Sequence, residues 1–226
     1  MIPPDLLFDL DGTLCDNFAG IAACIGHALQ RLDVPVPPAT ALRRFVGPPL
    51  RSTFAELLGT DSRDRIEEAL RHYRERFATL GWRENDVYPG IADALATLHG
   101  TGARLFVCTA KPQVYAERIV AHFGFAPHFT AVYGADLGGR LDDKATLLAH
   151  LLEREHIAPG RAVMIGDRAH DVRAAHHNGV RAIGVLGGYG DALELAPADL
   201  VVHTPAELTA ALLAGEAVPR GGYSSA

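Results

Sequence analysis

The sequence predicts an α/β protein: a Rossmann-like parallel sheet with helices on both faces, plus an inserted all-helical cap domain. Short apolar runs alternate with helical patterns along most of the chain, and strands that alternate with helices form parallel sheets covered on both faces. The alternation is interrupted once, over residues 16–86, where helical periodicity replaces it. We therefore expect an α/β core of residues 1–15 and 87–214 and a helical cap of residues 16–86.

The core elements follow from apolar runs and helix-start signals. The first strand is expected at residues 6–8, where the run Leu-Leu-Phe ends in Asp-Leu-Asp-Gly. Further strands are expected at residues 104–109, 130–133, 162–165, 181–185 and 200–202, with helices after Pro112, Asp142, Arg168 and Thr204. The last helix opens with Thr204-Pro205-Ala206-Glu207, a capping box with proline at the first helical position. Residues 215–226, rich in Gly, Pro and Ser, are expected to form a flexible tail.

The interrupting segment shows three helical patterns and no convincing strand. Apolar residues fall on one helical face twice, first at Phe18, Ile21, Ile25, Leu29 and Leu32, then at Ile66, Leu70, Tyr73, Phe77 and Leu80. Between these faces, Gly47-Pro48-Pro49-Leu50 opens a helix that reaches about Leu58. Because the segment begins just after the first strand, a helical domain there is well placed to act as a lid over the strand end.

Composition limits the classes of partner. The chain has 226 residues, 48% of them hydrophobic, and a mean hydropathy of +0.08, values typical of a soluble globular protein. The formal net charge of −6 gives no basic surplus that would favour a nucleic-acid polymer or a membrane surface. A small phosphorylated metabolite is the expected partner, and we expect a monomer or a dimer.

Cysteine usage and the start of the chain predict a cytoplasmic protein. The three cysteines lack metal-ligand spacing, which argues against a disulfide framework and against a zinc site. The segment Met1-Ile2-Pro3-Pro4-Asp5 has no basic region of the kind that opens a signal peptide. No apolar run approaches the roughly 20 residues that a membrane-spanning helix needs.

Four polar clusters stand at or near the predicted carboxyl ends of strands, where ligands bind in open α/β sheets. They are Asp9 with Asp11, Thr109, Lys144, and Asp167 with Asp171. Asp9 and Asp11 lie two residues apart on an extended segment, so their side chains point the same way. One carboxylate of such a pair can attack phosphorus while the other serves as acid and base.

Each cluster also has a purely structural interpretation. Asp-x-Asp-Gly is a common turn, Asp167 could cap a helix with Asp171 in its first turn, and most lysines like Lys144 are solvated. The four clusters together, in this order and at successive strand ends, favour one phosphoryl site. Several carboxylates at that site suit Mg²⁺, which prefers oxygen ligands.

These segments resemble the four motifs of the haloacid dehalogenase-like hydrolase superfamily. Phe8-Asp9-Leu10-Asp11-Gly12-Thr13-Leu14 is similar to the first motif, Thr109 to the second, Lys144 to the third, and Gly166-Asp167-x-x-x-Asp171 to the fourth. The helical insertion is similar to the small all-helical cap of that superfamily. The segments Phe45-Val46-Gly47-Pro48-Pro49-Leu50, Thr109-Ala110-Lys111-Pro112 and Gly187-Gly188-Tyr189-Gly190 look closest to its phosphoglycolate phosphatase and bacterial 5'-nucleotidase-like branch.

The resemblance implies a magnesium-dependent phosphatase that hydrolyses a small phosphate monoester, phosphoglycolate-like or nucleoside-monophosphate-like, through an aspartyl-phosphate. Asp9 would attack phosphorus, and Asp11 would protonate the leaving oxygen and then deprotonate the water. Mg²⁺ would be held by the Asp9 carboxylate, the Asp11 backbone carbonyl and Asp167, with Asp171 direct or through water. The phosphoryl oxygens would be held by Thr109, the Ala110 backbone N–H and Lys144.

The presence or absence of single residues argues for or against other reactions known in this superfamily. Asp11 argues against dehalogenation, because dehalogenating members generally lack the second aspartate. Residues 1–110 contain no lysine, which argues against phosphonate cleavage through a cap lysine. Two alternatives stay open: a phosphomutase acting on a sugar phosphate, and a non-catalytic regulatory module that binds phosphate. Asn17, where serine is common, and Ala145, where proline is common, affect the choice of subfamily and remove no chemical group.

Substrate contacts are expected from basic residues near the cleft. The candidates are Arg51, Lys111 and Arg168, the last of which lies inside the fourth motif and could also touch a cap carboxylate. Nineteen of the 21 basic residues are arginine, so the two lysines, Lys111 and Lys144, stand out. The eleven histidines show no ligand spacing and receive no role.

Overall fold

The computed structural model describes residues 5–136 and 141–215, and its centre is a six-stranded parallel sheet in the order β5-β4-β1-β6-β7-β8. The strands are β1 (Asp5–Phe8), β4 (Leu105–Pro112), β5 (Ala131–Ala135), β6 (Ala162–Gly166), β7 (Arg181–Val185) and β8 (Leu200–Val202). Phe8 at the end of β1 pairs with Val107 on one side and Ile165 on the other. The carboxyl ends of β1, β4 and β6 therefore meet at one edge of the sheet.

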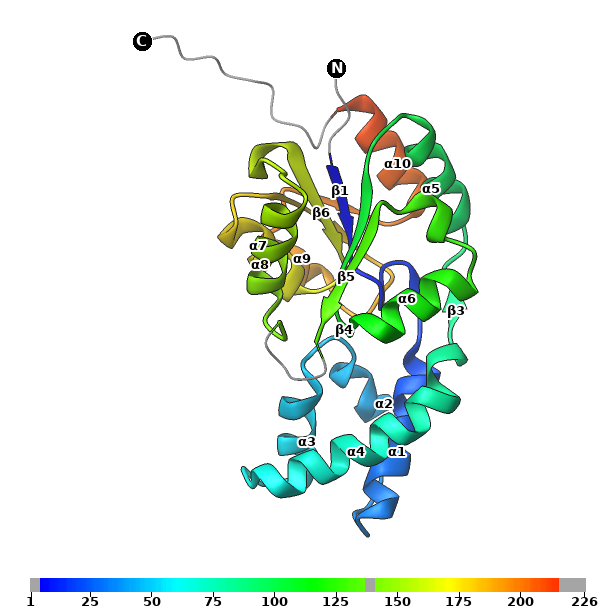
Figure 1. Ribbon diagram of the computed structural model, residues 1–226, viewed down its shortest axis with the longest axis vertical. Helices are drawn as coiled ribbons and strands as arrows, with labels where there is room; N and C mark the ends of the chain where they lie inside the picture. Colours follow the sequence, from blue (N-terminus) through cyan, green and yellow to red (C-terminus); the bar gives the residue numbers. More distant parts are fainter. Residues whose placement is uncertain (1–4, 137–140, 216–226) are drawn as a thin grey trace.

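Helices cover both faces of the sheet (Figure 1). One face packs against α5 (Ile91–Gly100), α6 (Gln113–His122) and α10 (Pro205–Ala214), and the other against α7 (Lys144–Arg154), α8 (Ala169–His177) and α9 (Ala192–Leu195). Alternate side chains of β1 separate between the two layers: Leu6 and Phe8 join the first core cluster and Leu7 the second. This arrangement confirms the predicted fold class.

The inserted segment consists of helices that lie beyond the carboxyl ends of the strands (Figure 1). They are α1 (Phe18–Arg31), α2 (Ala39–Leu42), α3 (Leu50–Leu58) and α4 (Arg63–Thr79). Their apolar faces build a third core cluster, separate from the two that flank the sheet. Of the residues predicted to lie on these faces, Leu80 is 41% exposed because it follows the last residue of α4.

A two-stranded antiparallel ribbon of β2 (Cys15–Asp16) and β3 (Asp86–Val87) carries the chain into and out of the helical segment. The sequence did not predict this ribbon, because a two-residue strand has no periodicity to detect. It brings the two chain crossings side by side, with Asp16 opposite Asp86. The boundaries predicted for the cap, residues 16 and 86, fall in this ribbon, and the division of the chain into two domains stays a prediction.

Contacts between the helical segment and the sheet layers hold the segment over the strand ends. Arg51 of α3 pairs with Asp142 at 3.0 Å, and Arg118 of α6 donates to the carbonyl of Ala78 at 3.2 Å. Arg168, predicted as a possible partner of a cap carboxylate, instead donates to the Val46 carbonyl of the helical segment.

Short helical turns complete the described structure: η1 (Arg43–Phe45), η2 (Gly81–Arg83), η3 (Ala126–His128) and η4 (Pro159–Arg161). The capping box predicted at Thr204 is only half formed. The Thr204 hydroxyl accepts from the Glu207 N–H at 3.1 Å, but the Glu207 carboxylate accepts from the N–H of His203 rather than from that of Thr204. Most of the predicted tail, residues 216–226, lies outside the described residues.

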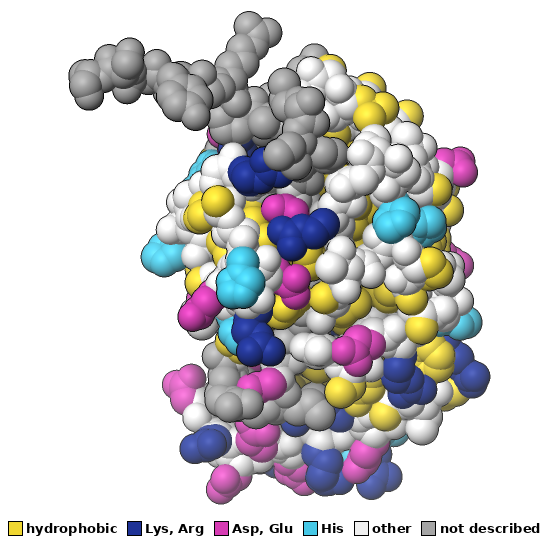
Figure 2. All heavy atoms as spheres, turned by 45° about the horizontal axis from the view of Figure 1, so that its top comes forward, with side chains coloured by type: hydrophobic (Ala, Val, Ile, Leu, Met, Phe, Trp, Pro, Cys, Tyr) yellow, Lys and Arg dark blue, Asp and Glu magenta, His cyan; other side chains and the backbone are white. Residues whose placement is uncertain are grey.

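The surface carries mixed charge where it can be seen. Figure 2 shows acidic and basic side chains interspersed over the visible face rather than gathered by sign. Within residues 5–136 and 141–215, no helix combines the length and the apolar character needed to cross a bilayer.

Candidate active site

Three residues predicted to act together form a buried ion cluster at the strand ends. Lys144 Nζ lies 2.9 Å from Asp9 Oδ1 and also pairs with Asp171 Oδ1. The three residues are 5% exposed or less. Asp9 follows β1, Asp171 lies in the first turn of α8, and Lys144 opens α7, so the cluster joins three elements.

The start of α7 explains why Lys144 faces inward. Its preceding residue, Asp143, caps the helix by accepting from the Thr146 N–H at 2.8 Å. The apolar face of α7, including Leu147 and Leu148, packs on the sheet, which fixes the helix against the strands. The Lys144 side chain thus reaches the cluster and is not a solvated surface group.

Electrostatics within the cluster favour an ionised Lys144. Burial alone would lower the pKa of Lys144, but Asp171 and Asp9 outweigh it and raise that pKa. Burial would raise the pKa of Asp171, yet Lys144 and His170 hold it below the ordinary value. For Asp9, burial dominates over the opposing effect of Lys144, and the pKa is raised. Asp171 is therefore the stronger ionic partner of Lys144.

Asp11 lines the same pocket as Asp9 but has different partners. Its Oδ2 lies 2.7 Å from Lys111 Nζ, and its Oδ1 accepts from the side-chain amide of Asn17. The Lys111 side chain is 4% exposed and that of Asp11 12% exposed. Each of the two candidate catalytic carboxylates therefore has its own lysine.

Asp167 is fully buried beside this cluster. Its Oδ2 accepts from the Tyr189 N–H at 2.7 Å, and its Oδ1 accepts from the Thr13 hydroxyl at 3.3 Å. A Cβ on Gly188 would stand 2.4 Å from Asp167 Oδ2, so the loop after β7 needs glycine to approach this carboxylate. Burial, then Asp171 and Asp9, raise the pKa of Asp167 well above its ordinary value.

A bulge in β4 places the second motif. Thr109 pairs with Gly134 and Pro112 with Ala135, so Ala110 and Lys111 have no partner on β5. The strand was predicted to end at Thr109, but it continues through this bulge to Pro112. Thr109 Oγ1 accepts from the Lys111 N–H at 3.3 Å. Thr109, Ala110 and Lys111 all line the pocket.

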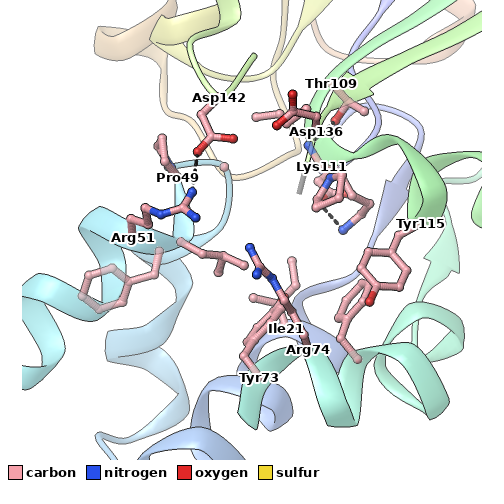
Figure 3. Close-up of a pocket in the computed structure, with 18 of the residues that line it drawn as sticks. Ile21, Pro49, Arg51, Tyr73, Arg74, Thr109, Lys111, Tyr115, Asp136 and Asp142 are labelled. Atoms are coloured by element: carbon pink, nitrogen blue, oxygen red, sulfur yellow. Dashed lines mark hydrogen bonds and ion pairs between the residues drawn. The ribbon is translucent and has the colours of Figure 1, made fainter. Parts of the chain in front are cut away.

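The pocket lies between the strand ends and the helical segment. Figure 3 shows Arg51, Tyr73 and Arg74 on the helical side and Thr109, Lys111 and Asp136 on the other side. Much of the helical wall is apolar, and it includes Ile21, Phe45, Leu50, Tyr73 and Phe77. Tyr115 of α6 adds a further aromatic side chain. A substrate that places its phosphoryl group near Asp9 would extend its leaving group toward this wall.

The three predicted substrate contacts occupy different places. Arg51 lines the pocket but is already paired with Glu67 and with Asp142; Figure 3 shows the pair with Asp142. Lys111 lines the pocket beside Asp11. Arg168 is not among the residues that line it, and its guanidinium contacts Glu194 at 2.8 Å.

Sequence reasoning missed His170. Ligand atoms of Asp9, His170 and Asp171 all lie within 4.8 Å of one another, an arrangement that could hold a metal ion. Burial lowers the pKa of His170, which favours the neutral imidazole. Its only signal in the sequence was its place inside the fourth motif. Arg74 was missed as well, although it lies between Leu70 and Phe77 on the edge of the apolar face of α4.

Part of the donor set predicted for magnesium lies together: ligand atoms of Asp9 and Asp171 belong to one group within 4.8 Å, whereas Asp167 accepts from Thr13 and Tyr189. Asp9, Asp11, Asp167 and Asp171 supply four carboxylates, against the ammonium groups of the only two lysines in the chain. Asp9 Oδ1 and Asp171 Oδ1 both make ion pairs with Lys144. A divalent cation would balance the remaining negative charge, and oxygen donors match Mg²⁺.

Comparison with known proteins finds a hydrolase family model and relatives named as enzymes that hydrolyse phosphate esters. A family model described as haloacid dehalogenase-like hydrolase matches residues 6–185. A 5'-nucleotidase from Pseudomonas aeruginosa is 46% identical over 192 residues, which cover 85% of this chain and 86% of that protein. A phosphoglycolate phosphatase from Chromobacterium violaceum is 31% identical over 206 residues, covering 89% of this chain and 92% of the other.

Two further matches are a protein named as a kinase and a solved structure of a predicted phosphatase. Tyrosine-protein kinase PtkA from Mycobacterium tuberculosis is 39% identical over 204 residues, covering 89% of this chain and 69% of the kinase. The solved structure of a predicted phosphatase from Clostridium acetobutylicum superposes with a TM-score of 0.90 at 36% identity. That superposition covers 95% of this chain and 100% of the other.

Proposed function

Because the chain belongs to the haloacid dehalogenase-like hydrolase family, we propose that it is a magnesium-dependent phosphatase acting on a small phosphate monoester through an aspartyl-phosphate. The observation that carries this proposal is the buried cluster of Asp9, Lys144 and Asp171 at one end of a pocket that also holds Asp11. The relatives named 5'-nucleotidase and phosphoglycolate phosphatase support a phosphoric monoester hydrolase.

The first step forms a bond between an Asp9 carboxylate oxygen and phosphorus while the phosphorus bond to the leaving oxygen breaks. Asp11 donates a proton to that leaving oxygen, and the leaving group departs as an alcohol. In the second step Asp11 takes a proton from water, whose oxygen attacks phosphorus and releases Asp9 and inorganic phosphate. The position of Asp11 in the pocket but outside the Asp9–Lys144 pair suits this exchange.

Positive charge must gather where phosphoryl charge develops. Lys144 beside Asp9, with Thr109 and the Ala110 N–H from the β4 bulge, would hold the phosphoryl oxygens. Mg²⁺, held by Asp9, Asp167, Asp171 and the Asp11 carbonyl, would supply charge that offsets these carboxylates. Lys144 also limits the rise in the pKa of Asp9 that burial causes, which keeps the nucleophile closer to its reactive, ionised form.

The pocket wall bears on the substrate class. Phosphoglycolate has a two-carbon leaving group, whereas the helical side offers Phe45, Tyr73 and Phe77. A nucleoside 5'-monophosphate has a ring that such a wall can contact. We therefore favour a nucleoside-monophosphate-like substrate, with residues 16–86 acting as the cap that selects it.

The test is release of inorganic phosphate by the purified chain from nucleoside monophosphates, 2-phosphoglycolate and sugar phosphates, with Mg²⁺ and after its removal with EDTA. We expect turnover only with Mg²⁺, and we expect Asp9→Asn to abolish it while the thermal unfolding midpoint stays close to that of the parent. Asp93→Asn, on the exposed side of α5, is the matched control and should retain activity. Magnesium-dependent hydrolysis that persists in Asp9→Asn would refute the assignment.

The same assay separates the alternatives. A phosphomutase, or a phosphotransferase such as the relative named a tyrosine-protein kinase, would pass the phosphoryl group to an acceptor hydroxyl and release little inorganic phosphate. A regulatory module would bind phosphate without turnover. Release of stoichiometric phosphate and alcohol is the result that supports hydrolysis.

A further inference from the structure

We propose that Lys111 is a positioning residue: it orients the Asp11 carboxylate for proton transfer and links that orientation to the helical segment through Phe77. The inference rests on the proposed function, because it assigns Asp11 the role of acid and base. It also revises the sequence-based expectation that Lys111 contacts the substrate.

The first observation is the way Asp11 is held. Lys111 Nζ lies 2.7 Å from one carboxylate oxygen, and the Asn17 amide donates to the other. A carboxylate held at both oxygens has one orientation, and the ion pair with the ammonium is the stronger of the two restraints. Without the ammonium, Asn17 alone would hold Asp11, and the carboxylate would gain freedom to turn.

The second observation is a contact across the boundary between sheet and helical segment. Lys111 Nζ lies 4.8 Å from the centroid of the Phe77 ring in α4. That ring is itself fixed, since it stacks on Tyr73 at 5.5 Å between centroids and meets Tyr115 edge to face at 4.9 Å. A cation–π contact is stronger when it is shielded from water, as this buried ammonium is. The ammonium therefore has its full set of contacts only when α4 lies over the pocket.

The third observation is the backbone at Lys111. The residue lies in the β4 bulge, and its N–H donates to the hydroxyl of Thr109, a predicted phosphoryl contact. The stem of the side chain is buried, so the ammonium has little room to move. The ammonium of lysine is a compact charge at the end of a flexible stem, and here it lies between a carboxylate and the face of a ring.

A positioning role makes a prediction that a substrate contact does not. An alkyl phosphate needs a proton on its leaving oxygen, whereas p-nitrophenyl phosphate releases p-nitrophenolate, a stable anion that needs almost no protonation. Loss of Asp11 orientation should therefore harm the first substrate much more than the second. A lost substrate contact would instead raise KM for any substrate that uses it, and it would leave this leaving-group preference unchanged.

The test compares kcat/KM for a nucleoside monophosphate and for p-nitrophenyl phosphate, because kcat/KM reports the step that forms the phosphoenzyme. In Lys111→Met, which keeps the length of the side chain, we expect a fall of about 100-fold for the alkyl ester, the scale of general acid catalysis, and only a small fall for the aryl ester. Phe77→Leu should show the same selectivity with a smaller loss. The double variant should be no more impaired than Lys111→Met, because the two residues act on one group.

Arg118→Met is the matched control. Arg118 also makes a cation–π contact toward the helical segment, 4.2 Å from the Trp82 ring centroid, but it lies outside the pocket lining. Its removal should leave the ratio between the two substrates unchanged. An equal fall for both esters in Lys111→Met and Phe77→Leu, or a selective fall in Arg118→Met, would overturn the proposal. If the parent protein hydrolyses neither ester, the proposed function fails, and the role of Lys111 fails with it.

Discussion

The pairing of each candidate catalytic aspartate with its own lysine divides the site into two parts. Asp9 shares Lys144 with Asp171 in a buried cluster, whereas Asp11 meets Lys111 at the pocket wall. Asp11 is also more exposed than Asp9, at 12% against 4% of the side chain. The proposed nucleophile is thus held rigidly, and the proposed proton-transfer group is the one that substrate and water can reach more easily.

This division predicts the kinetic effect of Asp11→Asn. The amide is nearly isosteric but cannot exchange a proton, so phosphoenzyme formation and its hydrolysis should both slow by about 10²–10⁴-fold. Rapid-quench measurement with a ³²P-labelled substrate resolves the two steps. Parent-like rates for both steps would disprove the acid/base role, and slowing of formation alone would show that another group activates water.

Sequence position predicts which residues come together at the site, but it does not predict which residues each of them contacts. Asp9, Thr109, Lys144 and Asp171 lie near strand ends, and the topology of a parallel sheet brings such positions together; the structure places all four at one end of the sheet. Partner choices are different, because they depend on three-dimensional approach. Nothing in the order of residues indicates that Lys111 reaches Asp11 or that the Tyr189 N–H reaches Asp167.

The secondary-structure elements show the same contrast between features that sequence position predicts and features that depend on three-dimensional contacts. The strands were predicted within a few residues, because buried runs such as 162–166 are apolar and end in glycine or aspartate. The β2–β3 ribbon and the β4 bulge were not predicted. The ribbon has only two residues in each strand, the bulge has two unpaired residues on β4, and both depend on a partner strand. The bulge matters most, because it turns the end of β4 toward the pocket.

Gly134, opposite the bulge, provides a test of that element. A Cβ at this position would stand 2.6 Å from the Lys111 carbonyl oxygen and 2.7 Å from Gln113 backbone atoms. Because backbone must shift to accommodate it, Gly134→Ala should destabilise the protein by about 1–3 kcal/mol. It should also lower activity, since the shift displaces Lys111. Urea unfolding and phosphate release measure the two effects.

Gly160→Ala is the control for this substitution. A Cβ there meets nothing within 4 Å, so the change in unfolding free energy should stay within about 0.5 kcal/mol. A Gly134→Ala variant as stable and active as this control would show that the bulge is adaptable and does not fix the second motif.

At the scale of the whole molecule, three separate apolar clusters underlie the fold. Two flank the sheet and the third lies within the helical segment, with Tyr115 of α6 joining it from the sheet side. Some contacts that cross between the two parts are buried, such as Lys111 with the Phe77 ring. Others are partly exposed, such as Arg51 with Asp142, whose side chains are 37% and 32% exposed. Exposed ion pairs of this kind contribute about 0–1 kcal/mol. We propose that the helical segment, which has its own core, can open separately from the sheet layers.

If the helical segment opens separately, a mild substitution in its core should destabilise that segment and leave the sheet unaffected. Ile25 is fully buried in the helical cluster, so Ile25→Val should cost about 0.5–1.5 kcal/mol. If the helical segment is a separate cooperative unit, amide hydrogen exchange should accelerate about 2- to 12-fold in α1 and α4 and stay unchanged in β1, β4 and β6. Ile183→Val in β7 is the counterpart in the sheet core and should accelerate exchange in the sheet. Uniform acceleration throughout the chain for both variants would mean that cap and core unfold as one unit, and the proposed lid would then have to move as a rigid body without local unfolding.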